Sequence, residues 1–230
     1  MIIGNGLLAK AFSAEFAPDT GAIVFASGVS NSRETRPEAF ERERTLLEQA
    51  LGQDKRLMYF STCSIQDPDL ANSAYVRHKL AMEELIQRRA PKYAIFRLPQ
   101  VVGHTPNPHT LTNYLHHTIE SGDVFHVWTR ARRNLIDVDD VVGIAHQLLV
   151  RGEAENRILN IACPFSIPVI ELVKVFENVM DRKANYDLVE AGGSYAIDVT
   201  EAMQAAKEAG IVIDAAYIDK LIRKYYEPAR

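Results

Sequence analysis

The sequence has little of what marks secreted, metal-binding, membrane or nucleic-acid-binding proteins. Its two cysteines, Cys63 and Cys163, belong to no CxxC or Cys/His cluster, so neither a disulfide framework nor a metal site is predicted. No apolar run reaches the ~18 residues of a membrane span, and the first residues lack the basic segment and apolar core of a signal peptide. The formal net charge of -4 excludes an electrostatic surface for nucleic acid or membranes. We therefore expect a cytoplasmic protein that keeps both thiols and has no nucleic-acid or membrane partner.

A regular alternation of short apolar runs and helical periodicity fills the first half of the chain. Strand-like runs at 1–4, 22–26, 57–61 and 93–98 alternate with helical patterns at 6–17, 37–52 and 73–90. This order predicts a parallel sheet with helices on both faces, because βαβ units build such sheets and bury their strands on both sides. After a turn-rich loop, the expected elements are a helix at 109–121, strands at 124–128 and 134–138, a helix at 139–151, a strand at 158–162, and helices at 167–181, 200–209 and 214–226.

A glycine-rich loop joins the first predicted strand to the first predicted helix. The stretch "IIGNGLLA" places Gly4, Gly6 and Ala9 in a G-x-G-x-x-A pattern. The first glycine permits a tight turn, the second lets the backbone approach a pyrophosphate, and the small third residue lets the helix pack on the strand. The helix N-terminus would favour the anion. The loop therefore predicts a dinucleotide site, with a ligand-free glycine turn as the alternative.

The carboxylate that usually holds the adenosine ribose of a dinucleotide is absent. It is expected about 20 residues after the glycines, where this chain has "FASGVSNS" at 25–32. Arg33 and Arg36 follow and could meet a 2′-phosphate, or they could be solvated loop charges. The choice between NAD and NADP therefore stays open.

A tyrosine and a lysine four residues apart begin the helix predicted at 73–90. Tyr75 and Lys79 would share one helix face, where the ammonium group favours the phenolate form of the tyrosine. The strand before this helix ends with Ser61, Thr62 and Ser64 at the carboxyl edge of the sheet, where ligands of open α/β sheets bind. A hydroxyl, a phenol and an ammonium group would therefore meet at one carbonyl or alcohol. The spacing of tyrosine and lysine alone is a weak signal.

Several motifs in order resemble the extended short-chain dehydrogenase/reductase family, of the NAD-dependent epimerase/dehydratase type. The resemblance is to its nucleotide-sugar epimerases, dehydratases and 4-ketoreductases, and it covers nearly the whole chain. It is carried by the segments "GNGLLA", "STCSI", "YVRHK", "FRLPQVVG", "RRNLIDVDDVV" and "LNIACPFSIPVIELV". It implies an α/β, Rossmann-like parallel sheet with a truncated cofactor-binding part at 1–99. A small substrate-binding lobe at 100–230 would be interleaved with the last sheet strands.

The resemblance also implies roles for the residues at the sheet edge. Tyr75 would be the acid–base residue, and Lys79 would bind the nicotinamide ribose and favour the phenolate. Thr62 would hydrogen-bond the reacting oxygen, with Ser61 and Ser64 as rivals. Cofactor contacts are implied for Gly4, Asn5, Gly6, Leu7, Leu8, Ala26, Ser27, Lys79 and Pro99.

The substrate side has its own implied residues. Arg133 matches the arginine that grips the diphosphate of a nucleotide sugar, with a surface pairing to Asp137 or Asp139 as the alternative. Substrate contacts are also implied for Gln100 and Asn113. His109, in "NPHTLTNYL", resembles the general acid of fucose-forming epimerase/reductases, with a simple loop histidine as the alternative.

Two departures from the family pattern bear on the cofactor and the substrate. The spacing from Gly4 to Tyr75 is much shorter than in the family, and "AIVFASGVSNS" resembles its fourth strand rather than its second. One or two early βα units, the second and third of the family, are therefore predicted to be missing, together with much of the adenosine pocket. Gln100 stands in place of the usual asparagine, and "IQD" at 65–67 replaces V-Y-G.

The sequence thus predicts a nucleotide-sugar 4-ketoreductase or epimerase that uses NADP or NAD, in bacterial-type deoxysugar or polysaccharide biosynthesis. Reduction is preferred over epimerisation, and Cys63 and Ser64 after Thr62 argue against dehydration. A non-catalytic nucleotide-binding or partner-binding module of the same fold is the alternative. A reductase of a small non-nucleotide ketone is a third interpretation. A homodimer through the helix at 73–90 is implied, although packing inside the monomer explains the same apolar face.

Overall fold

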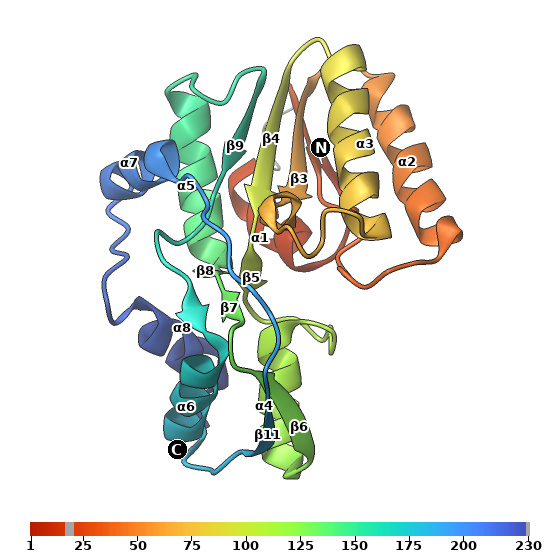
Figure 1. The fold of residues 1–230 in the computed structure, drawn as a ribbon. Helices are drawn as coiled ribbons and strands as arrows, with labels where there is room; N and C mark the ends of the chain where they lie inside the picture. Colours follow the sequence, from red (N-terminus) through yellow and green to blue (C-terminus); the bar gives the residue numbers. More distant parts are fainter. Residues whose placement is uncertain (17–20, 229–230) are drawn as a thin grey trace.

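The computed structural model describes residues 1–16 and 21–228, and its centre is a five-stranded parallel sheet (Figure 1). The strand order is β1-β2-β3-β4-β9. The strands are β1 (Ile2–Ile3), β2 (Ala22–Phe25), β3 (Arg56–Thr62), β4 (Tyr93–Leu98) and β9 (Arg157–Asn160). The predicted Rossmann-like α/β sheet is confirmed. Residue 17 of the first predicted helix and residues 229–230 of the predicted lobe lie outside the described residues.

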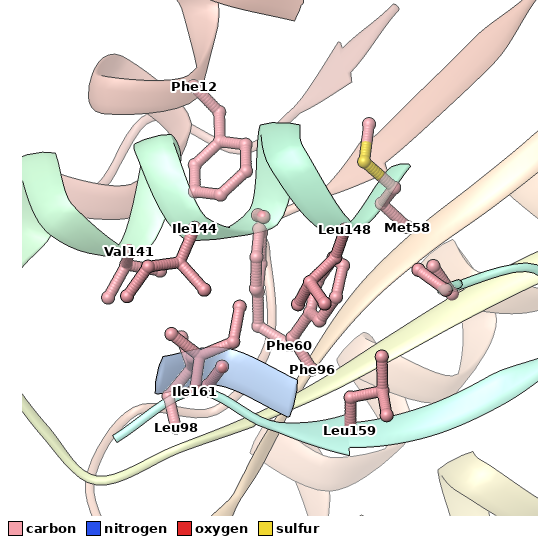
Figure 2. Packing of buried hydrophobic residues seen from close by; sticks show 14 of the residues in the cluster. Phe12, Met58, Phe60, Phe96, Leu98, Val141, Ile144, Leu148, Leu159 and Ile161 are labelled. Atoms are coloured by element: carbon pink, nitrogen blue, oxygen red, sulfur yellow. The ribbon is translucent and has the colours of Figure 1, made fainter. Parts of the chain in front are cut away.

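Helices cover both faces of this sheet. One face packs against α1 (Leu7–Phe16), α5 (Val138–Val150) and α7 (Thr200–Glu208), and the other against α2 (Pro37–Leu51) and α3 (Ala74–Arg89). Figure 2 shows the first of these cores, in which side chains of α1 and α5 meet those of the strands. Its labelled members are Phe12, Met58, Phe60, Phe96, Leu98, Val141, Ile144, Leu148, Leu159 and Ile161.

The alternation of side chains along β3 explains why its sequence is apolar throughout. Met58 and Phe60 belong to the core beneath α1 and α5, whereas Leu57 and Tyr59 belong to the core beneath α2 and α3. Successive side chains of a strand point to opposite faces, and here both faces are covered. A continuous apolar run is therefore the pattern that a central strand requires.

Strand β1 lies at the edge of the sheet and pairs only with β2 among the described residues. The connections β1–α1–β2 and β2–α2–β3 advance in the same direction along the sheet but cross opposite faces. They therefore have opposite hands, so one of them is of the left-handed form that only about 2 % of such connections adopt. The predicted loss of early βα units is confirmed, since no described strand lies outside β1.

A second, smaller core lies below the sheet in the view of Figure 1. It is built from α4 (Leu111–Ser121), α6 (Val169–Met180) and α8 (Tyr217–Tyr226), together with two parallel strands, β6 (Val124–Trp128) and β11 (Asn185–Val189). Large buried members of this core include Leu115, Ile119, Phe125, Leu172, Phe176, Tyr217, Leu221 and Ile222.

Two short strand pairs join the sheet to this lobe. Strand β5 (Gln100–Val102) pairs in parallel with β8 (Leu135–Asp137), and β7 (Arg132–Arg133) pairs antiparallel with β10 (Ile167–Pro168). The chain then returns to the sheet through α5 and β9, and again through α7. The division at residue 99 stays a prediction. Segments from both sides of that residue build the first core.

The sequence-based expectations miss short strands and misplace three helix starts, one of them that of α6, which begins at Val169 rather than 167 because β10 occupies Ile167–Pro168. Strands β5, β7, β10 and β11 were not expected, since they have two to five residues and, in β11, little buried surface. Helix α4 begins at Leu111 rather than 109, because the Thr110 side chain accepts a hydrogen bond from the Asn113 N–H and so starts the helix. Helix α8 begins at Tyr217 rather than 214, after a turn in which the Asp214 carboxylate accepts the Ala216 N–H.

Both cysteines are buried as free thiols. Burial raises the pKa of the Cys63 thiol to about 12, so the thiol form dominates at neutral pH. Within residues 1–16 and 21–228 there is no group of three His, Cys, Asp or Glu side chains that could hold a metal ion. No helix in the same part of the chain is long and apolar enough to cross a membrane.

Candidate active site

A cavity of about 640 Å³ opens at the carboxyl edge of the sheet, between the sheet and the lobe. The topology explains its position. Helix α1 leaves β1 toward one face and α2 leaves the neighbouring β2 toward the other, so the two loops diverge and leave a crevice. In most open α/β sheets such a crevice forms where the strand order reverses. The order of the described strands does not reverse here, but the crevice forms in the same way because α1 and α2 lie on opposite faces. The wall is completed by the loops after β3 and β4 and by residues of the lobe.

The glycine loop forms one wall and is shaped by a close backbone approach. Gly4 has a φ of +128°, and a Cβ there would lie 2.4 Å from the Ala26 carbonyl oxygen, so only glycine fits. A Cβ on Gly6 would meet no atom within 4 Å. Asn5, Gly6, Leu7 and Leu8 line the cavity at the N-terminus of α1, whereas Gly4 packs behind them. The loop therefore fits a pyrophosphate held by backbone N–H groups.

Two hydroxyl groups at the end of β3 face the cavity. Thr62 Oγ1 accepts the Ser64 N–H at 3.1 Å, which leaves its own hydroxyl hydrogen available for a ligand oxygen. Ser61 also lines the cavity, but its Oγ is buried and has no hydrogen-bond partner among the described residues. An unpaired buried hydroxyl costs free energy unless a ligand or water satisfies it. Ser61 therefore stays a rival of Thr62, although its Oγ is buried.

Tyr75 lies in the first turn of α3, which begins where the Ser73 side chain accepts the Val76 N–H. Its ring packs on Val29 and Val76 and lines the cavity. Lys79 lies one turn further, with its Nζ 6.0 Å from the centre of the Tyr75 ring. The tyrosine and the lysine therefore share one helix face beside the cavity.

Lys79 is engaged by a buried carboxylate that the sequence analysis did not anticipate. Its Nζ donates to Glu43 Oε1 at 3.0 Å, to Tyr59 Oη at 3.2 Å and to the Phe60 carbonyl at 3.4 Å. The three N–H groups of the ammonium therefore all have protein acceptors. The ammonium fits a cofactor ribose only if one of these acceptors is released.

Glu43 is completely buried in α2 and accepts hydrogen bonds from four groups. Oε1 accepts from Tyr59 Oη at 2.6 Å as well as from Lys79, and Oε2 accepts from the Val29 N–H at 2.6 Å and contacts His78 Nε2 at 3.0 Å. Burial alone would raise the pKa of Glu43, but the Lys79 charge and these hydrogen bonds together hold it well below its usual value. The residue is therefore an anion at neutral pH, inside the protein.

The lobe contributes polar groups to the opposite wall. Arg133 lines the cavity from β7, and its guanidinium donates to the Arg132 carbonyl at 2.8 Å. Pro99 and Gln100 line it where β4 passes into β5. His109 is exposed on the loop before α4 and also lines the cavity. Of the residues implied by the sequence, the cavity brings together Asn5, Gly6, Leu7, Leu8, Ala26, Ser27, Thr62, Tyr75, Lys79, Pro99, Gln100, His109 and Arg133.

Asn113 has a different place from the one expected. Its Nδ2 donates to the carbonyls of Thr105 and Asn107, both at 2.8 Å, and its Oδ1 accepts from Tyr226 Oη at 2.7 Å. The amide is therefore fully used in fastening the loop before α4 to α4 and α8. This side chain positions the loop that carries His109.

Sequence reasoning missed several residues of the cavity wall. Tyr195 comes from the segment after β11 that crosses the front of the molecule, and burial raises its pKa to about 12. The residues around Tyr195, which include Gly192 and Gly193, show neither helical nor strand periodicity, so the sequence did not single out this tyrosine. Arg42 lies on a predicted helix, but nothing in the pattern distinguished it from the charges around it. The other unexpected lining residues with polar side chains include Arg132, Asn134 and Ser166.

The chain belongs to the NAD-dependent epimerase/dehydratase family, whose sequence profile matches residues 5–162. The predicted membership of the extended short-chain dehydrogenase/reductases, in a shortened form, is thereby confirmed. The dependence of this family on NAD agrees with the predicted cofactor class, NADP or NAD. No curated protein matches the chain.

Solved structures share the fold at low sequence identity. RMD from Pseudomonas aeruginosa, complexed with NADPH, has a TM-score of 0.66 and 16% identity, with 96% of this chain and 94% of that chain covered. UDP-glucuronic acid 4-epimerase from Bacillus cereus, in complex with UDP-glucuronic acid and NAD, has a TM-score of 0.71 and 16% identity, with 96% and 78% covered. UDP-glucose 4-epimerase from Thermotoga maritima, with UDP-glucose, has a TM-score of 0.67 and 18% identity, with 94% and 81% covered.

Proposed function

We propose that the protein is an NAD(P)-dependent enzyme that reduces a keto group of a nucleotide sugar or epimerises one of its carbons. The observation that supports this proposal is the single cavity that combines a glycine loop at a helix N-terminus, the Tyr75 phenol and the Arg133 guanidinium. These groups match a pyrophosphate, a proton-transfer step and the diphosphate of a nucleotide. Reduction is the favoured direction. A homodimer is a further expectation of the resemblance, and a cytoplasmic location is one of the sequence pattern.

In the proposed chemistry the cofactor transfers hydride, and side chains of the protein transfer the proton and stabilise charge. A bound nicotinamide would supply the group that donates or accepts hydride. Tyr75 would give its phenolic proton to the sugar oxygen during reduction, or take the proton back during oxidation. The free hydroxyl hydrogen of Thr62, or that of Ser61, would stabilise the charge developing on that oxygen. His109 would be the general acid if the reaction includes an epimerisation.

Arg133 is proposed to hold the nucleotide. A guanidinium can donate two parallel hydrogen bonds to phosphate oxygens, which fixes orientation as well as binding. Arg132 lies beside it on β7 and is held by the Ser166 carbonyl, so both cations belong to one rigid strand pair. Gln100 would contact the sugar from the adjoining strand. Inhibition by free nucleoside diphosphates distinguishes this proposal from a reductase of small non-nucleotide ketones.

The first test is a titration of the protein with NADPH and NADH, followed by nicotinamide fluorescence. Saturable binding at micromolar concentration supports the proposal and justifies a screen of keto-sugar nucleotides for cofactor oxidation. In that assay Tyr75→Phe should lower turnover about a hundredfold or more while the protein stays folded. Tyr114→Phe is the matched control, because Tyr114 is exposed on α4 away from the cavity. A fully active Tyr75→Phe variant would exclude the assignment.

The two candidate hydroxyls can be separated in the same assay. Thr62→Val and Ser61→Ala each remove one hydroxyl from the cavity wall with little change in volume. Loss of the donor that stabilises the reacting oxygen should lower turnover about a hundredfold, whereas loss of the other should have a small effect. If neither variant is impaired, the oxygen is stabilised by other groups and this part of the mechanism is wrong.

A non-catalytic nucleotide-binding module remains a second candidate, and one observation favours it. The Lys79 ammonium has all three N–H groups engaged by protein acceptors. An ammonium committed in this way is less able to assist proton transfer than a free one. Tight binding of nucleotide sugars without any oxidation or reduction of added cofactor would support this alternative.

A further inference from the structure

The most unusual group beside the cavity is the buried Glu43 carboxylate, to which the proposed reaction assigns no role. Helix α2 supplies it, yet its four hydrogen-bonding partners come from the loop after β2, from β3 and from α3. Glu43 and Lys79 have almost no exposed surface. Taking two charges out of water is costly, and the cost is offset only by close pairing and complete hydrogen bonding, both of which are present.

The pair is also fixed sterically. Gly28 lies directly against it, since a Cβ at that position would be 2.6 Å from Lys79 Nζ and 3.0 Å from Glu43 Oε1. The Tyr59 hydroxyl donates to Glu43 and accepts from Lys79, so it bridges the two charges. Any larger residue at position 28 would therefore displace the ammonium, so glycine is what leaves space for the pair. On the other sides the N–H groups of the ammonium already point at acceptors.

We propose that Glu43 is a positioning residue that competes with a bound ribose for the ammonium group of Lys79, and so weakens the binding of nicotinamide dinucleotides. The inference rests on the proposed function, because a ribose hydroxyl is the group that would need Lys79. To donate to it, Lys79 must give up one of three protein acceptors.

The competition predicts opposite effects on stability and on affinity. Removing the Glu43 charge leaves the buried ammonium without its ionic partner, so the protein loses stability. The same change weakens one acceptor of the Lys79 ammonium. A ribose hydroxyl can then accept a hydrogen bond from Lys79 at a lower cost, so the ligand binds more tightly. A purely structural role for Glu43 predicts that stability and affinity fall together. The signs of the two changes therefore separate the two roles.

The experiment is a titration of wild type and Glu43→Gln with NADPH, with thermal unfolding of the same samples. We expect Glu43→Gln to bind NADPH about fivefold to tenfold more tightly than wild type, as for one gained hydrogen bond of ordinary net strength. Its unfolding temperature should be lower. Glu48→Gln is the control, because Glu48 lies on the same helix, is partly exposed and pairs with arginines away from the cavity.

A second variant keeps the test decisive if Glu43→Gln does not fold. Tyr59→Phe removes one acceptor of Lys79 and keeps the ring in the core, so one N–H group becomes available. We expect it to bind NADPH about threefold more tightly than wild type. Unchanged or weaker binding by the folded variants overturns the inference.

The outcomes also separate this inference from the proposed function. If wild type binds NADPH and the variants bind no better, the proposed cofactor stands and the competition is wrong. If only the variants bind, the competition is right and the wild-type protein does not use this cofactor. If none of the folded proteins binds either NADPH or NADH, both are wrong.

Discussion

Lys79 and Lys224 are both held by carboxylates, but they lie in very different surroundings. Lys79 meets Glu43 inside the protein, where the exposed fractions of the two side chains are 3% and 0%. Lys224 bridges Asp137 and Asp139, both at 2.7 Å, and its own side chain is 45% exposed. The distances are similar, so burial makes the difference. Water screens the exposed ammonium of Lys224 although Asp137 is buried, so this contact adds less to stability, whereas the Lys79 pair cannot lose one member without leaving a charge in the interior.

The two networks also connect different parts of the molecule. The Lys79 network fastens α2, α3 and β3 beside the cavity, within the sheet-containing part. The Lys224 network fastens α8 of the lobe to the first turn of α5, where Asp137 is the N-cap and also accepts from Tyr225 Oη at 2.7 Å. The first network therefore lies beside the candidate site, whereas the second connects the lobe to α5.

The largest effect is expected when the buried pair loses its cation. Lys79→Met leaves the Glu43 carboxylate buried with three polar neighbours but no charge to balance it, and should lower the free energy of unfolding by about 3–5 kcal/mol. Urea denaturation followed by circular dichroism measures this change. A loss below about 1 kcal/mol would place the Lys79 pair in the same class as an exposed one.

The next largest effect is the recovery of stability when the second charge of the pair is removed as well. Replacing both charges, in Glu43→Leu with Lys79→Met, removes the uncompensated charge and fills the same space with apolar atoms. We expect the double variant to be more stable than Lys79→Met alone and close to wild type, since apolar replacements of buried ion pairs are often neutral. The same denaturation experiment, arranged as a double-mutant cycle, gives the coupling energy. Additive losses would show that the two side chains do not act as a pair.

A smaller effect is expected at the lobe. Asp137→Ala removes the N-cap of α5 as well as the contacts with Lys224 and Tyr225, and should cost about 1–2 kcal/mol. Lys224→Met removes only the half-exposed cation and should cost no more than about 1 kcal/mol. A larger loss for Lys224→Met than for Lys79→Met would reverse the comparison.

The pH dependence of the two networks should be opposite in sign. The folded-state pKa of Glu43 lies below its ordinary value of 4.5, so its contribution to stability is present above that pH and is lost as the pH falls below it. The folded-state pKa of Lys224 is raised, although burial opposes this, because it donates to Asp137 and Asp139. Its contribution is therefore present below 10.5 and is lost as the pH rises. The stability difference between wild type and Glu43→Gln should shrink in acid, and that between wild type and Lys224→Met in alkali.

The fold could be predicted from the sequence because its signals are local. Runs such as "LMYFS" at 57–61 are typical of central strands, and the glycines at 4 and 6 mark the loop that follows β1. Glu43 could not be found in this way. It stands among other charges in "FERERTLLEQ", which is the pattern of a solvated helix face, and its burial results from the arrangement of three other elements.

The site was predictable to the extent that its residues follow motifs. Thr62, Tyr75 and Arg133 lie on segments with a recognisable order, and the structure places all three in one cavity. Asn113 belongs to such a segment too, but its partners come from a loop and from α8, far along the chain. Tyr195 has no motif at all. Contacts between distant segments decide both cases, and one sequence does not reveal them.

The edge position of β1 has a consequence for how the protein opens. This strand has two residues and one neighbour among the described residues, whereas β3 is paired with strands on both sides. We expect amide hydrogens of the first βα unit to exchange with solvent through local openings that require less free energy than global unfolding. A ligand on the glycine loop would bind the closed form alone and slow this exchange, by an amount that grows with its concentration. A bound nucleotide would thus stabilise the first βα unit, which has no neighbouring strand on its outer side among the described residues.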